Sequence, residues 1–91
     1  MTNIEILKSL LEDVCPEKNM FILKNNISDD LDLITDLDFD SLQFVSLFLN
    51  IEKTYSIELS NEVYNFDNVR KLTDLIRCID DSIEKGNQNN E

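Results

Sequence analysis

The 91-residue chain contains no histidine, one glycine, one proline and two cysteines. Without an imidazole it cannot use Ser-His or Cys-His nucleophiles or His-ligated zinc. Dinucleotide and P-loop phosphate sites need several glycines, so a single Gly86 argues against both kinds of site. Cys15 and Cys78 form neither a disulfide framework nor a CxxC motif, and we interpret them as reduced thiols. The sequence therefore predicts no catalytic residues and no metal site.

Basic residues are also scarce, since 8 Lys and Arg stand against 19 Asp and Glu, for a formal net charge of −11. A nucleic-acid binder must neutralise phosphates with Lys and Arg, so this balance argues against one. The chain has no run of 18 apolar residues, and its N-terminal segment lacks the basic region of a secretion signal. We expect a cytoplasmic monomer without membrane insertion, whose partners present basic surfaces.

Apolar residues recur at helical spacing along much of the chain and predict an all-α fold. The first helix is expected over residues 3–14. A capping box formed by Thr2 and Glu5 would open this helix, and Pro16 would end it. Residues 16–40 lack a clear period. The apolar run of residues 20–23 is compatible with a helical turn or with an extended piece. We interpret the whole segment as a long loop held to the core by its apolar side chains.

A second helix is expected from Asp40, its N-cap, to about Tyr55. Gln43 is placed to reach back to the cap residue. Its apolar residues separate into two stripes at 100° per residue. The first stripe, which would face the core, comprises Phe44, Leu47, Phe48, Ile51 and Tyr55. The second, Leu42, Val45 and Leu49, is interleaved with polar residues and predicts a docking surface, unless the helix is buried all round.

The C-terminal half completes a small four-helix bundle. A short third helix is expected over residues 61–66, and a fourth would be capped by Asp67 or Asn68. Residues 1–85 would form a single domain. Residues 86–91 are polar and unpatterned, so we predict a disordered tail.

Ser41 is predicted to be the first residue of the second helix. The backbone N–H groups there have no intrahelical acceptor, and the helix dipole favours an anion by about 0.3–1 kcal/mol. The Ser41 hydroxyl is therefore well placed to carry a phosphodiester. Simple capping by a serine at a helix start is the alternative interpretation.

The string Asp36-Leu37-Asp38-Phe39-Asp40-Ser41-Leu42 resembles the phosphopantetheine attachment motif of acyl carrier proteins, in which Asp-Ser-Leu opens the second helix. The resemblance extends from about Ile4 to Ile83. Residues 33–37 resemble the family's first loop, 51–59 the end of its second helix with the following turn, and 69–76 its final helix.

The resemblance implies that a phosphopantetheinyl transferase attaches 4'-phosphopantetheine from coenzyme A to Ser41, next to Leu42. The thiol of the arm would hold acyl groups as thioesters, and Asp40 would cap the helix and help the transferase to recognise the site. The chain would be a stand-alone carrier rather than an enzyme. Its other partners would be acyl-loading and acyl-processing enzymes of fatty-acid, polyketide or specialised-metabolite biosynthesis. A peptidyl or aminoacyl carrier, or a helical adaptor without a prosthetic group, are the alternatives.

The resemblance also implies roles for both faces of the second helix. The expected docking residues are Leu42, Val45, Leu49 and Glu52, and the expected acyl-pocket residues are Phe44, Leu47, Phe48 and Ile51. The chain departs from the family at Asp38, where glycine is usual, and in carrying its acidic residues mainly on the loop before Ser41. These departures favour a specialised pathway over a housekeeping fatty-acid role. The lack of a Gly-rich approach to Ser41 favours acyl over peptidyl cargo.

Asp36, Asp38 and Asp40 also imitate the start of a calcium-binding EF-hand loop. Such a loop needs glycine at its sixth position and a bidentate glutamate at its twelfth. Those positions are Ser41 and Leu47, so the sequence argues against an EF-hand.

Overall fold

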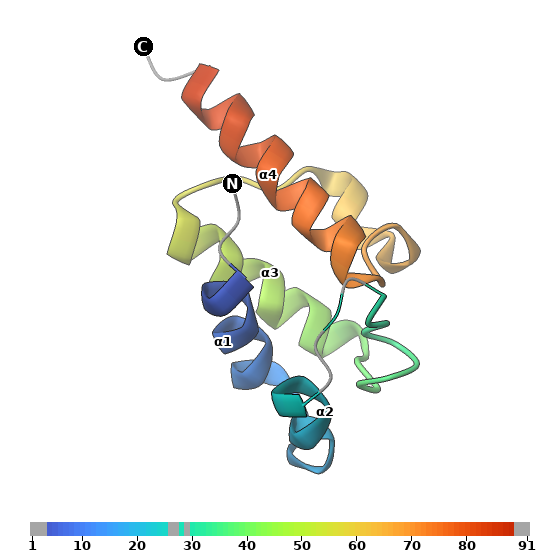
Figure 1. Cartoon of the computed structure of the whole chain (residues 1–91). Helices are drawn as coiled ribbons and strands as arrows, with labels where there is room; N and C mark the ends of the chain where they lie inside the picture. The colour runs from blue at the N-terminus through green and yellow to red at the C-terminus, as the bar shows by residue number, and fades with distance from the viewer. Residues whose placement is uncertain (1–3, 26–27, 29, 89–91) are drawn as a thin grey trace.

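The structure is a computed structural model that describes residues 4–25, 28 and 30–88 (Figure 1). Within these residues the regular elements are helical, and the single β-bridge, between Asp32 and Lys71, is isolated. The α-helices are α1 (Ile4–Val14), α2 (Met20–Asn25), α3 (Ser41–Tyr55) and α4 (Leu72–Gln88). The 3₁₀ turns are η1 (Glu17–Asn19), η2 (Asn61–Tyr64) and η3 (Phe66–Asn68). The all-α prediction is confirmed.

The first predicted helix corresponds to α1, which ends as the sequence indicates. Cys15 N–H donates to the Leu11 carbonyl at 2.9 Å, and Pro16 then takes an extended conformation with ψ of 140°. A residue before proline is driven out of the helical region, so the chain turns here. The predicted cap residue Thr2 and the predicted start at residue 3 lie outside the described residues.

The prediction of one loop over residues 16–40 is wrong in its first part. Residues 17–25 form η1 and α2, and among the described residues that follow, 28 and 30–40 form no helix. Six residues are too few for a helical period to be recognised, and so short a helix is stable only through packing. Leu23 provides that packing, since its side chain is fully buried in the common core.

The third and fourth helices differ from the prediction. Residues 61–64 form a 3₁₀ turn rather than an α-helix, with the Ser60 hydroxyl accepting from the Glu62 N–H at 3.2 Å. Helix α4 begins at Leu72, so neither Asp67 nor Asn68 caps it. The cause is the preceding segment, because the Arg70 carbonyl accepts from the Leu33 N–H at 2.6 Å. This bond and the isolated bridge between Asp32 and Lys71 tie the segment to the loop, and the helix starts only at Leu72.

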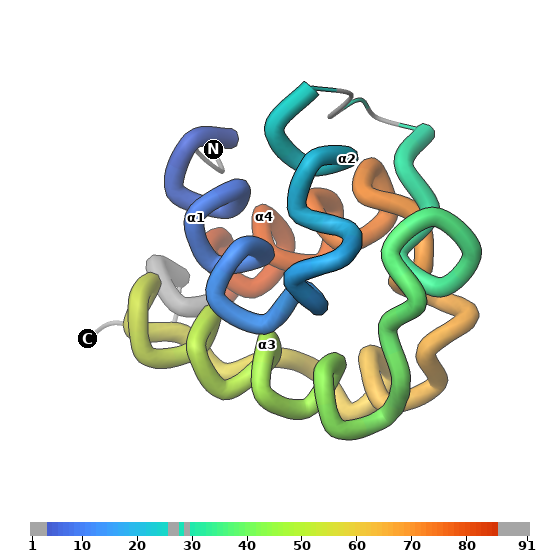
Figure 2. Tube along the Cα trace, turned by 90° about the horizontal axis from the view of Figure 1, so that it is seen from below, coloured from blue at the N-terminus to red at the C-terminus, as the bar shows by residue number. Residues whose placement is uncertain are grey.

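Helix α4 continues to Gln88 and thus includes the first three residues of the predicted tail. Once a helix is nucleated, each further residue adds one hydrogen bond at low cost, which allows it to pass Gly86. Residues 89–91 lie outside the described residues. Helices α3 and α4 both begin on the same side of the molecule, and α4 runs away from the start of α3 (Figures 1 and 2).

One hydrophobic core joins all four helices and the loop before α3. An aromatic cluster dominates the end where α3 begins. Phe44 stacks on Phe66 with 4.6 Å between ring centroids, and Phe39 meets Phe44 edge-on at 5.6 Å. Phe48 contacts Tyr64 edge-on at 5.5 Å. These contacts fix η2 and η3 against the buried face of α3.

Candidate functional site at the start of helix α3

The predicted capping box at the start of α3 is confirmed. Asp40 has an extended backbone, and its Oδ1 accepts from the Gln43 N–H at 3.1 Å. The Gln43 Oε1 accepts in turn from the Asp40 N–H at 2.8 Å. Ser41 follows as the first helical residue and is exposed. Within the described part of the chain, no hydrogen bond engages the Ser41 hydroxyl.

Two amide side chains connect this helix start to the N-terminal part of the fold. The Gln43 Nε2 donates to the Val14 carbonyl at 3.3 Å, which joins α3 to the end of α1. The Asn19 Nδ2 donates to the Leu37 carbonyl at 2.8 Å, which joins η1 to the loop before Ser41. The sequence gives no sign of this role of Asn19, because its partner is 18 residues away and no local pattern indicates the contact.

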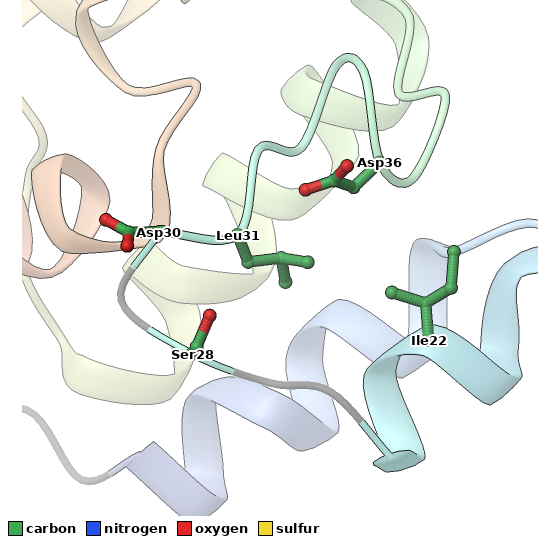
Figure 3. Close-up of a pocket in the computed structure, with 5 residues that line it drawn as sticks. All are labelled: Ile22, Ser28, Asp30, Leu31 and Asp36. Atoms are coloured by element: carbon green, nitrogen blue, oxygen red, sulfur yellow. The ribbon is translucent and has the colours of Figure 1, made fainter.

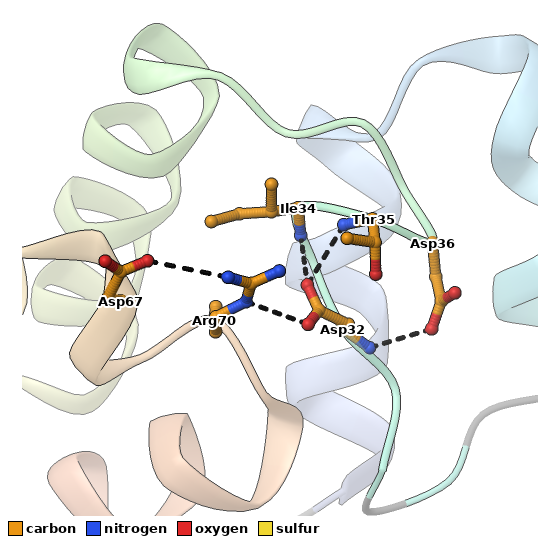
Figure 4. Close-up of polar contacts among 6 residues, drawn as sticks. All are labelled: Asp32, Ile34, Thr35, Asp36, Asp67 and Arg70. Atoms are coloured by element: carbon orange, nitrogen blue, oxygen red, sulfur yellow. Dashed lines mark hydrogen bonds and ion pairs between the residues drawn. The ribbon is translucent and has the colours of Figure 1, made fainter.

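Asp32 organises the same loop from the other side (Figure 4). Its Oδ1 accepts from the Ile34 and Thr35 N–H groups at 2.9 and 3.0 Å, and its Oδ2 accepts from Arg70 Nε at 2.8 Å. Burial acts to raise the pKa of Asp32, but the hydrogen bonds from Thr35, Arg70 and Ile34 outweigh it and lower the pKa. The carboxylate is therefore firmly ionised at neutral pH.

Asp38 lies in the left-handed region with φ of 59°, where a Cβ atom is unfavourable. Its carboxylate is 3.5 Å from Lys18 Nζ, but both side chains are well exposed, so the ion pair contributes little. The backbone conformation explains why glycine is usual at this position in the family that the motif resembles.

Replacing Asp38 provides a direct test of this conformation. Asp38→Gly is expected to be more stable than Asp38→Ala by about 1 kcal/mol, because both lose the carboxylate but only glycine removes the Cβ clash. Urea unfolding of the two variants measures the difference. An alanine variant as stable as the glycine variant would contradict a left-handed residue 38.

The two predicted faces of α3 are confirmed as one buried and one accessible face. Phe44, Leu47, Phe48 and Ile51 are buried, and Tyr55 is partly buried against the same core. On the other face Leu42 is 78% exposed and Leu49 is 56% exposed, while Val45 is half-buried. The helix is therefore not buried all round. We call Leu42, Val45 and Leu49 the exposed strip.

Glu52 has a structural contact that the sequence did not reveal. Its Oε2 accepts from the Leu59 N–H at 2.9 Å and so fixes the chain that leaves α3. The same carboxylate would have to serve both this contact and the expected contact with a partner enzyme. The remaining charged side chain toward this end of the helix is Lys53, which is exposed.

The structure opens no acyl pocket among the predicted residues Phe44, Leu47, Phe48 and Ile51, which lie packed in the described core. A cavity of about 340 Å³ lies elsewhere, between α2 and the loop (Figure 3). It is lined by Ile22, Ser28, Asp30, Leu31 and Asp36. An acyl pocket at the predicted residues stays a prediction, and it requires the core to open.

Other site chemistries find little support in the described residues. No group of three or more His, Cys, Asp or Glu side chains there is arranged to hold a metal ion. Leu47, at the twelfth position of the imitated EF-hand loop, is buried in the core and has no oxygen that could bind a calcium ion.

The two cysteines are not activated. Burial, followed by nearby acidic residues, raises the pKa of the free thiols Cys15 and Cys78, which disfavours the reactive thiolates. The described helices include none long and apolar enough to cross a membrane.

Comparison with known proteins places this site in a family. A family model described as "Phosphopantetheine attachment site" matches residues 5–76, which include the whole capped start of α3. The chain belongs to the acyl carrier protein family. An acyl carrier protein of Phytoplasma mali (strain AT) is 36% identical over 61 residues, which are 66% of this chain and 73% of that protein. No solved structure matches the chain significantly.

Acyl carrier proteins carry covalently attached 4'-phosphopantetheine, and the residues at the start of α3 fit this group. Ser41 is exposed and its hydroxyl is unengaged by described residues. The Asp40 carboxylate accepts from the Gln43 N–H, and within the described residues it has no hydrogen bond to the N–H groups of Ser41 or Leu42, so these first amides of the helix can face a phosphate. The family works as carriers for acyl-processing enzymes, with a transferase that attaches the arm.

Proposed function

We propose that Ser41 is the attachment residue and that this chain carries acyl groups between the enzymes of a specialised biosynthetic pathway. The observation that supports the proposal best is the Ser41 hydroxyl, which is exposed at the first position of a capped helix and makes no hydrogen bond to any described residue. It also lies inside the matched family region and directly before the exposed strip.

The chain's own residues would prepare this attachment rather than catalyse it. Asp40 and Gln43 hold the first turn of α3 in place through their reciprocal hydrogen bonds. The positive end of the helix dipole then favours a phosphodiester on Ser41 by about 0.3–1 kcal/mol. When attached, the arm supplies a thiol that holds an acyl group as a thioester. The tether raises the effective concentration of that group at each enzyme.

The exposed strip would be the surface to which partner enzymes bind. Leu42 follows Ser41 directly, so in an enzyme that packs on Leu42 and Leu49 the arm on Ser41 would start next to the contact surface. Exposed apolar side chains that lie together on one face of a protein commonly mark an interaction site. Acidic residues lie mainly on the loop, and Glu52 is the one acidic residue of α3, which supports a dedicated set of partners.

Modification by a transferase tests the attachment proposal. Incubation with coenzyme A and a broad-specificity phosphopantetheinyl transferase is expected to add one phosphopantetheine, measured by intact mass. Ser41→Ala is expected to gain none. Ser46→Ala is the matched control, because it removes another exposed hydroxyl from the same helix, and it should be modified fully.

The same experiment separates the alternatives. A helical adaptor without a prosthetic group would keep its mass with every transferase. Modification of Ser41→Ala would place the arm on another residue and contradict the proposal. To distinguish acyl from aminoacyl cargo, acyl-loading and amino-acid-activating enzymes are offered to the modified protein, and the cargo is identified by its added mass.

A further inference from the structure

We propose that Arg70 and Asp32 are positioning residues for attachment at Ser41. Their contact holds the loop of residues 31–40 in the geometry from which Ser41 is presented to the transferase. This inference rests on the proposed attachment at Ser41. It assigns to Arg70, just before α4, an effect on chemistry that occurs at the start of α3.

The contact ties together two segments that are 38 residues apart in sequence. Arg70 Nε lies 2.8 Å from Asp32 Oδ2, and the Asp32 side chain is only 13% exposed. Two backbone bonds flank the pair, from Leu33 N–H to the Arg70 carbonyl at 2.6 Å and from Leu72 N–H to the Leu31 carbonyl at 2.9 Å. We call the side-chain pair with these two bonds the loop clamp.

Asp32 passes this constraint into the loop (Figure 4). While Oδ2 accepts from Arg70, Oδ1 accepts from the Ile34 and Thr35 N–H groups. The Asp32 N–H donates to Asp36 Oδ2 at 2.9 Å, and the Asp36 N–H donates to the Asp32 carbonyl at 2.8 Å. One side chain therefore both closes the turn of residues 32–36 and fastens it to the segment before α4.

The constraint reaches the residue before the helix cap. Phe39 N–H donates to the Leu33 carbonyl at 2.9 Å, and Leu33 is the residue whose own N–H is held by Arg70. Phe39 is buried against Phe44, and Asp40 with Ser41 follow immediately. Two hydrogen bonds, from Leu33 to Arg70 and from Phe39 to Leu33, thus connect the segment before α4 with the residues that precede Ser41.

The loop needs such an external tie because its sequence does not rigidify it. Residues 31–40 contain no proline and no glycine, and Asp38 occupies an unfavourable left-handed conformation. Without Arg70, the Asp32 carboxylate would be left mostly buried with only backbone donors, which favours opening of the turn. The capping box at Asp40 is local and would survive this opening.

The expected result is a change in attachment kinetics without loss of the fold. Arg70→Ala should lower kcat/KM for transfer of phosphopantetheine about tenfold, mainly through kcat, since a charge-assisted hydrogen bond of this kind corresponds to roughly that factor. Amide hydrogen exchange of Leu33, Asp36 and Phe39 should be about tenfold faster, while exchange in the middle of α3 stays unchanged. Arg70→Lys keeps the charge and should recover part of the rate.

Two controls separate positioning from stability. Asp67→Ala removes the second carboxylate near Arg70, which is 3.6 Å from Nη1 and 76% exposed, and should keep the wild-type rate. Ile79→Val lowers stability from the buried side of α4, away from the clamp, and should also keep the rate. If Arg70→Ala does not fold, Arg70→Lys provides the test by the same readouts.

The outcomes distinguish this inference from the proposed function. If the wild-type chain is not modified at Ser41, both fail. If it is modified but Arg70→Ala reacts at the wild-type rate, the loop clamp has no positioning role and the attachment proposal stands. An equal slowing by Ile79→Val would assign the effect of Arg70 to stability alone and would overturn the inference.

Discussion

Phe44→Ala is expected to lower the free energy of unfolding by about 3–5 kcal/mol, the usual cost of removing a buried aromatic ring. Phe44 is 1% exposed and stacks on Phe66 with 4.6 Å between ring centroids. Its ring centroid also lies 5.6 Å from that of Phe39 and 5.9 Å from that of Phe48. Loss of one ring therefore opens a cavity between α3, η3 and the loop before Ser41. Urea unfolding followed by far-UV circular dichroism measures the loss.

Leu42→Ala is the matched control for this prediction, because it truncates an apolar residue of the same helix on the exposed side. Its cost should stay within about 0.5 kcal/mol, as for surface substitutions in general. A loss below about 1 kcal/mol for Phe44→Ala would mean that the ring is not a central element of the core.

The second large effect is expected on partner enzymes. Replacing Leu42 and Leu49 together by serine should lower kcat/KM of an acyl-loading enzyme toward the modified chain by about 10- to 100-fold. Burial of each leucine in a complex contributes about 1.5–3 kcal/mol at most, and 1.4 kcal/mol corresponds to a factor of ten. The stability of the free chain should change little, because both side chains are already more than half exposed.

Phe21→Ser is the control for that experiment. Phe21 is 60% exposed on α2, so the variant removes a comparable apolar surface outside the exposed strip. Its kcat/KM with the same enzyme should be that of the wild-type chain. If Phe21→Ser is as harmful as the double variant, or if the double variant reacts normally, partner enzymes do not use the strip as we propose.

The sequence predicts α3 well because its determinants are local. The cap and its reciprocal partner, Asp40 and Gln43, are three residues apart, and both hydrogen bonds form. The two stripes follow from helical spacing alone, since 15 residues span several turns. Ser41 is exposed at the first helical position for the same reason. The helix start and its exposed serine can therefore be predicted from the sequence without knowledge of any tertiary contact.

The elements that the sequence does not predict depend on distant partners. Helix α4 starts at Leu72 because Arg70 and its neighbours pair with the loop, 38 residues earlier. Helix α2 is too short to show a period, and its order comes from burial of Leu23. The bond from Leu59 to Glu52 likewise joins residues on either side of a turn. No residue pattern within a single element predicts any of these contacts.

The direction of α4 has a practical consequence. Its C-terminal turns, drawn in red, lie far from the start of α3 in both views (Figures 1 and 2). A fluorescent dye or a surface anchor attached to those turns would leave the serine and its neighbouring leucine open to visiting enzymes. The same protein could then be immobilised and still report, through that dye, on each enzyme that binds.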